Sequence, residues 1–89
     1  MKIPSEILIG GHTVKIKLAP LEENGNSDFD TNTITIDSSL PQSQRESTLI
    51  HEILHFLNST LGDSPMGHAL LDSLAEQLYQ VLRTNHLLK

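Results

Sequence analysis

The chain has 89 residues, which suffices for one domain with a modest core, so we expect residues 1–89 to form a single domain. It carries 6 basic and 11 acidic residues, a formal net charge of -5, and therefore lacks the basic surface that binding to nucleic acid requires. Because there is no cysteine, disulfides and thiolate metal sites are excluded, and any transition metal must be held by His, Asp or Glu.

The N-terminal segment MKIPSEILIGGHTV contains only a short apolar run, too short for the hydrophobic part of a signal peptide. No other segment approaches the apolar length that crosses a membrane. We therefore expect a soluble, cytoplasmic protein without a membrane partner.

Three strands are predicted in the first half of the chain. Residues 6–9 and 12–18 flank Gly10-Gly11, and the second run alternates apolar and lysine side chains, which predicts a β-hairpin with a Gly-Gly turn. Residues 21–28 are acidic and contain turn-forming residues, which indicates a loop. The segment TNTITID, residues 31–37, alternates Thr with Ile and predicts a third strand, half-buried or at a sheet edge.

Two helices are predicted in the second half. The first, from about 42 to 61 and ended by Gly62, has an apolar stripe of Leu49, Ile50, Ile53, Leu54, Leu57 and Leu61. The second, from about 65 to 85, begins at Ser64-Pro65, and its stripe is Leu70, Leu71, Leu74, Ala75, Leu78, Val81 and Leu82. Strands followed by helices predict an α+β fold, with a three-stranded sheet against two packed helices.

The pentapeptide HEILH, residues 51–55, lies in the first predicted helix. His51 and His55 are one helical turn apart, so both imidazoles can reach one cation. Glu52 projects about 100° further round the helix, where it is poorly placed as an equal third ligand but able to reach a metal-bound water. Zinc acidifies such a water and polarises a carbonyl, while a glutamate accepts the proton. The pattern therefore predicts a hydrolytic zinc site.

A catalytic zinc needs a third protein ligand. In the second predicted helix, His68, Asp72 and Glu76 are spaced by four residues and form a row along one flank. The short connection makes the helices an antiparallel pair, which brings this row near His51 and His55. Asp72 and His68 are both candidates for the third ligand, and Glu76, the most exposed of the row, is a weaker one.

These residues resemble the signature of the zincin metallopeptidases, in which HExxH on one helix is followed by a third ligand on a later helix. The chain looks most like the very short zincins encoded by bacteria and phages. The similarity extends over TITIDSSLPQSQRESTLIHEILHFL and over LLDSLAEQLYQVLRTN near the end of the chain.

The resemblance implies a minimal zincin-like core in which His51 and His55 bind Zn²⁺ and Glu52 is the general base. In related small zincins an acidic residue precedes the Leu-Ala of the last helix, and Asp72 holds that position here in place of the commoner glutamate. Because aspartate is shorter by one methylene, His68 stays the alternative third ligand. The resemblance also places the strand TNTITID beside the cleft, with a free edge for an extended peptide.

We therefore expect a zinc metallopeptidase that hydrolyses a peptide bond in a peptide or protein substrate. The alternative is a non-catalytic, zinc-stabilised binding or regulatory module of phage or bacterial origin. The small size favours it, because a chain of 89 residues has few residues to line a substrate cleft. Glu52 favours the enzyme, since a structural zinc site does not need that carboxylate. The sequence specifies neither the cleavage specificity nor the oligomeric state.

Three other side chains have the chemistry of site residues but a simpler explanation. His12 follows a turn, and His86 lies in the last predicted helical turn, where a cation complements the helix dipole. A phenol such as Tyr79 is able to stabilise an oxyanion, but its place well along the second helix favours packing.

Overall fold

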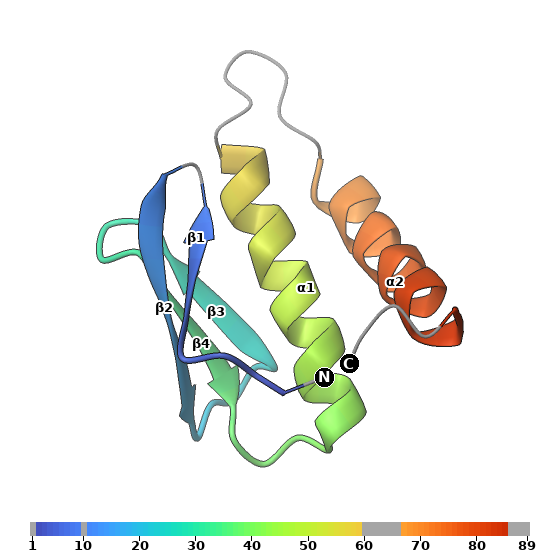
Figure 1. Ribbon diagram of the computed structural model, residues 1–89, viewed down its shortest axis with the longest axis horizontal. Coiled ribbons are helices and arrows are strands. Elements are labelled where there is room, and N and C mark those ends of the chain that lie inside the picture. The colour runs from blue at the N-terminus through green and yellow to red at the C-terminus, as the bar shows by residue number, and fades with distance from the viewer. Residues whose placement is uncertain (1, 10, 60–66, 86–89) are drawn as a thin grey trace.

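The computed structural model describes residues 2–9, 11–59 and 67–85, which form a sheet followed by two helices. The strands are β1 (Glu6–Ile9), β2 (His12–Ala19), β3 (Gly25–Asp28) and β4 (Thr33–Asp37), and the helices are α1 (Gln42–Ser59) and α2 (His68–Thr84). Helix α1 covers one face of the sheet, and α2 lies on the opposite side of α1 (Figure 1). The predicted α+β class is confirmed, but the sheet has four strands instead of three.

The sheet order is β1-β2-β4-β3. Strands β1 and β2 form the predicted antiparallel hairpin, with Ile7 opposite Val14. Gly11 adopts φ +82°, a conformation that glycine reaches without strain. Gly10, the other residue of the predicted turn, lies outside the described residues.

Strand β3 is the strand that the sequence analysis missed, because it falls within the predicted loop 21–28. Its sequence, GNSD, consists of residues that are depleted in strands. Backbone pairing overrides this preference: β3 runs antiparallel to β4, with Gly25 opposite Ile36 and Ser27 opposite Ile34. Tertiary pairing with a strongly β-forming neighbour therefore makes a strand of residues that would otherwise form turns.

The prediction that β4 lies at a sheet edge is wrong, whereas its alternative, a half-buried strand, agrees with the alternation of partly exposed Thr and buried Ile. Strand β4 pairs in parallel with β2 and antiparallel with β3, and its Ile34 and Ile36 are fully buried. Because both edges of β4 are used, it has no free edge to offer a peptide. The free edge on this side of the sheet belongs to β3.

The core lies between the sheet and α1. It consists of Val14, Ile16, Ile34, Ile36, Leu49 and Phe56, with further apolar side chains packed against it. The face of α1 toward the sheet also buries Thr48 and Glu52. Leu57, part of the predicted stripe, is exposed. The neighbouring Phe56 points to the core in its place.

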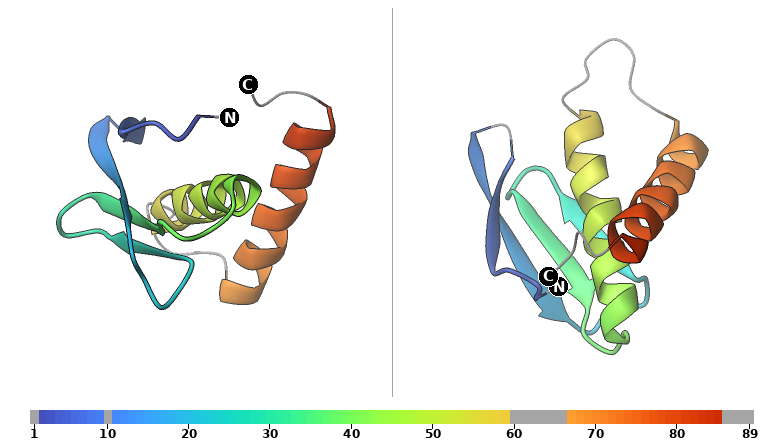
Figure 2. Two further views of the ribbon diagram at one scale, coloured as in Figure 1. Left: turned by 90° about the horizontal axis from the view of Figure 1, so that it is seen from below. Right: turned by 45° about the vertical axis from the view of Figure 1, so that its right-hand side comes forward.

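Helix α2 packs mainly against α1 (Figure 2). Only Leu71 and Ala75 of its predicted apolar stripe are buried, whereas Leu70, Leu74, Leu78 and Val81 are exposed. The predicted helix ends, at Gly62 and Ser64-Pro65, lie outside the described residues. Within them α2 begins at His68, after Gly67 in an extended conformation. No helix of the described part is long and apolar enough to span a membrane.

Candidate metal centre

Helix α1 brings two imidazoles together at the middle of the molecule. The Nε2 atoms of His51 and His55 lie 3.0 Å apart, and their ring centres are 4.7 Å apart. Burial lowers the pKa of His55 below its ordinary value, although the neighbouring Glu52 carboxylate acts in the opposite direction. His55 therefore favours the neutral form of the imidazole, which is the form that binds metal ions.

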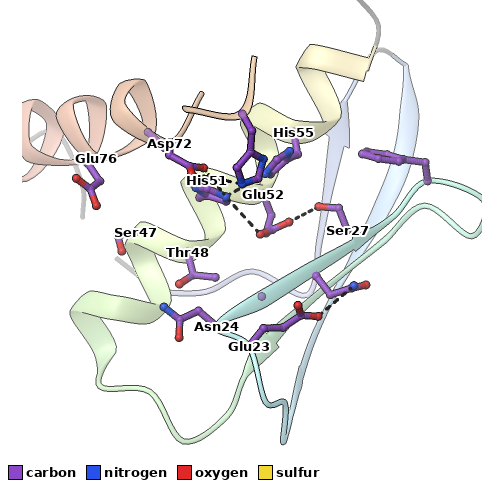
Figure 3. A pocket seen from close by; sticks show the side chains of 15 residues that line it. Glu23, Asn24, Ser27, Ser47, Thr48, His51, Glu52, His55, Asp72 and Glu76 are labelled. Atoms are coloured by element: carbon purple, nitrogen blue, oxygen red, sulfur yellow. Dashed lines mark hydrogen bonds and ion pairs between the residues drawn. The ribbon is translucent and has the colours of Figure 1, made fainter. Parts of the chain in front are cut away.

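Glu52 lies between this pair and the sheet, with only 6% of its surface exposed. The hydroxyl of Ser27, on β3, donates a hydrogen bond of 2.5 Å to its Oε1 (Figure 3). The other oxygen, Oε2, lies 4.0 Å from His51 Nε2. One carboxylate oxygen is therefore fixed by β3, while the other faces the histidines.

Helix α2 adds Asp72 from the opposite side. Its Oδ1 lies 3.4 Å from His51 Nε2, and its Oδ2 lies 3.4 Å from His68 Nε2. Oδ1 is buried and has no hydrogen-bond partner among the described residues. Burying a carboxylate oxygen without a hydrogen bond is costly, so a cation placed beside Oδ1 and the His51 ring would stabilise it.

Within the part of the chain that the structure describes, the potential metal donors form two overlapping groups: His51 with Glu52 and His55, and His55 with His68 and Asp72. In each group the donor atoms lie within 4.8 Å of one another. The structure thus brings together both predicted histidines and both candidates for the third ligand. Glu76 lines the same cleft but belongs to neither group.

The remaining candidates lie elsewhere. His12 is exposed at the start of β2 and does not line the cleft, and His86 lies outside the described residues. The hydroxyl of Tyr79 donates to Glu46 Oε1 on α1 at 2.9 Å, and burial raises its pKa. Tyr79 therefore joins the two helices, which agrees with the predicted packing role.

A cleft of about 630 Å³ opens over these side chains, and its walls are α1, the first half of α2, and β3 with the residues beside it. Gly25 permits the close approach of β3 to α1: a Cβ there would lie 2.6 Å from Thr48 Cγ2 and 3.2 Å from Glu52 Cγ. This approach brings the Ser27 hydroxyl within reach of Glu52. The exposed Phe29, next to β3, packs edge-on against Phe56 with ring centres 4.8 Å apart.

Ser27 and Gly25 are the site residues that sequence reasoning missed. Ser27 lies 25 positions before Glu52 in the sequence. Gly25 and Ser27 both belong to a segment with the composition of a turn. No local pattern marks either residue. Gly25 and Ser27 reach the site because β3 pairs with β4, and this pairing exists only in the folded chain.

A comparison with protein families finds a match to most of the chain. The model of Peptidase_M78, described as the IrrE N-terminal-like domain, matches residues 10–82, which include most of the sheet, all of α1 and most of α2. No curated protein and no solved structure matches the chain.

Proposed function

Because the chain belongs to the IrrE N-terminal-like domain family, which is related to the zincin-like metallopeptidases, we propose that it is a zinc-dependent peptidase. His51, His55 and Asp72 hold the metal, and Glu52 is the general base. Two imidazoles and a carboxylate form a donor set that zinc uses in hydrolytic enzymes, with one position left for water. The buried Oδ1 of Asp72, which makes no hydrogen bond among the described residues and lies 3.4 Å from His51 Nε2, supports the place of Asp72 among the ligands ahead of His68.

The placement of Glu52 is the observation that carries this proposal. A metal ion bound at this donor set polarises a substrate carbonyl and acidifies a water molecule. Glu52 Oε2, 4.0 Å from His51 Nε2, is positioned to accept the proton of that water and to pass it to the leaving amine. A metal site with a purely structural role has no use for a buried carboxylate fixed at one oxygen and turned toward the donors at the other.

The free edge of β3 supports a peptide as the substrate. Strand β3 borders the cleft, and its outer edge is unpaired among the described strands. An extended peptide can add to such an edge through main-chain hydrogen bonds, which places one of its carbonyls over the histidines and Glu52. The resemblance to the small zincins implied this role for the strand TNTITID, and we propose that β3 has it instead.

The test is cleavage of a diverse peptide library by the zinc-loaded protein, its Glu52→Gln variant and the control Glu22→Gln, which makes the same change at an exposed residue outside the cleft. We expect Glu52→Gln to keep its zinc and to lose about 10²- to 10⁴-fold in kcat/KM, because general-base catalysis contributes that much. The control should cleave like the wild type. Equal cleavage by wild type and Glu52→Gln, or none by either, contradicts the peptidase proposal.

One observation favours the alternative, a zinc-stabilised binding or regulatory module without catalysis. His68 adds a possible fourth protein donor beside the other three, and four protein donors are typical of structural zinc sites. One zinc per chain, with no cleavage by the wild type in the library experiment, would favour this alternative.

A further inference from the structure

Three histidines from two helices, His51, His55 and His68, line the same cleft. The ring centres of His51 and His55 lie 4.7 Å apart, those of His55 and His68 lie 5.5 Å apart, and those of His51 and His68 lie 6.4 Å apart. Two imidazoles that bind the same tetrahedral zinc through Nε2 have ring centres about 5 Å apart. The two separations that involve His55 are close to this value, whereas that between His51 and His68 is longer, so His68 must move toward His51 for all three rings to bind one ion.

Asp72 connects His68 to this set. One of its oxygens faces His51 and the other lies 3.4 Å from His68 Nε2. The donor atoms of His55, His68 and Asp72 also lie within 4.8 Å of one another. His68 therefore has a nitrogen aimed at the same donors as the proposed zinc ligands, from the side of the cleft opposite α1.

His68 differs from these ligands in how firmly it is held. Its side chain is 76% exposed, against 27% for His51, which projects from the central helix α1. It is the first residue of α2, and it follows Gly67, where an added Cβ would meet no described atom within 4 Å. Little packing is lost when the His68 ring turns outward, whereas His51 and His55 cannot leave without disturbing α1.

We propose that His68 is a fourth, displaceable protein donor, which closes the coordination of the metal in the resting protein and gives way when a substrate enters the cleft. This inference rests on the proposed peptidase function. Four protein donors leave no position for the water on which Glu52 acts, so the resting protein is latent. The histidine at the cleft mouth then couples activity to occupation of the cleft.

The experiment compares the full-length wild type with His68→Ala, and with His12→Ala as the matched control, an exposed histidine outside the cleft. His51→Ala and Asp72→Ala serve as references for the loss of a firmly held ligand. Zinc affinity is measured by competition with a chelator, and the donor number is followed by the visible absorption of the Co²⁺-loaded protein. Cleavage of a short peptide identified in the library is measured at saturating zinc.

We expect His68→Ala to bind zinc about tenfold or more weakly than the wild type, while still retaining it, and to change the Co²⁺ spectrum. It should cleave the peptide severalfold faster, because water then has permanent access. His12→Ala should match the wild type in all three measurements, and His51→Ala and Asp72→Ala should lose zinc.

An unchanged zinc affinity and Co²⁺ spectrum in His68→Ala would overturn the inference, whatever the peptidase result. Loss of zinc as complete as in His51→Ala, or slower cleavage, would also overturn it, since His68 would then be a required ligand. Weaker zinc binding and a changed spectrum without cleavage by any variant would support the donor role and contradict the peptidase function. A wild type that binds no zinc would overturn both proposals.

Discussion

Glu52 is the side chain on which the proposed chemistry depends, and residues from another part of the chain determine its position. The Ser27 hydroxyl is bonded to Oε1, so rotation of the carboxylate is restricted and Oε2 stays turned toward His51. Because Glu52 is buried, this bond also supplies a donor that water cannot replace. Ser27 is therefore a positioning residue for the proposed general base.

Ser27→Ala should reduce both stability and cleavage. The buried Glu52 oxygen loses its donor, which costs about 1–3 kcal/mol in the free energy of unfolding. We also expect kcat to fall with little change in KM, because the carboxylate is less well oriented in the reacting complex. Urea unfolding and steady-state kinetics test both effects, with Ser73→Ala, an exposed serine on α2, as the control. A variant as stable and active as the wild type would show that Ser27 does not position Glu52.

Gly25→Ala should strain the contact between β3 and α1. The added Cβ would lie 2.6 Å from Thr48 Cγ2, and Thr48 is buried and β-branched, so the strand must shift. We expect a loss of about 1–3 kcal/mol in the free energy of unfolding, measured by urea denaturation.

Two further variants test whether the clash with Thr48 causes the loss of stability in Gly25→Ala. Adding Thr48→Ser, which removes Cγ2, should restore part of the lost stability. Gly67→Ala is the matched control, because a Cβ there meets nothing within 4 Å and φ is -66°. A Gly25→Ala variant no less stable than Gly67→Ala would contradict the close-approach explanation.

At the scale of elements, the turn between β4 and α1 sets the direction of the helix that carries the histidines. Asp37, the last residue of β4, accepts hydrogen bonds from the backbone N–H groups of Leu21 and Ser39 and from the Ser39 hydroxyl. Arg45, in the first turns of α1, donates to the carbonyls of Ser38 and Leu40. These contacts hold α1 at a defined angle over the sheet.

The Asp37 contacts predict a pH dependence of stability. The hydrogen bond from the Ser39 hydroxyl, with help from backbone N–H groups, lowers the pKa of Asp37 below its ordinary value. A carboxyl whose pKa is lower in the folded state stabilises the fold above its unfolded pKa, about 3.9, and loses this contribution as the pH falls through the folded value.

Asp37→Asn should therefore be less stable than the wild type at pH 7, and this difference should shrink progressively below about pH 4. Unfolding by urea between pH 2.5 and 7 measures it. A difference that is constant across this range would show that ionisation of Asp37 does not stabilise the junction.

At the scale of the whole molecule, the layers are unequally connected. The sheet and α1 share the apolar core, whereas α2 buries only Leu71 and Ala75 and packs mainly against α1. The proposed ligands lie on both sides of this weaker interface, His51 and His55 on α1 and Asp72 on α2. A bound metal therefore links α2 to the rest of the domain.

Zinc should stabilise the whole protein and α2 most of all. Zinc at 100 times its Kd adds about 2.7 kcal/mol to the free energy of unfolding, which raises Tm, and a chelator should reverse the change. Amide hydrogen exchange should slow in α2 more than in the sheet, because the added link closes local opening of that helix. His51→Ala should show neither effect. Equal slowing in every element would contradict a specific link between α1 and α2.

The sequence by itself determined the features that depend on local pattern. The alternation in residues 12–18 and 31–37 predicted β2 and β4, and the three- and four-residue spacing predicted α1 and α2, because strands and helices have periods that side chains reveal. The helical period also placed His51 and His55 on one face and Asp72 in line with His68. The sequence therefore predicted a set of candidate metal donors without knowledge of the fold.

Only the tertiary structure decided how distant segments meet. It made β3 from turn-forming residues, moved β4 from a sheet edge to the centre, and buried Glu52 against Ser27. It exposed most of the α2 stripe and left the Asp72 Oδ1 buried beside His51, without a hydrogen bond among the described residues. The physical reason is that strand pairing and burial are set by contacts between residues far apart in sequence, whereas periodicity records only which side of its own element a residue faces.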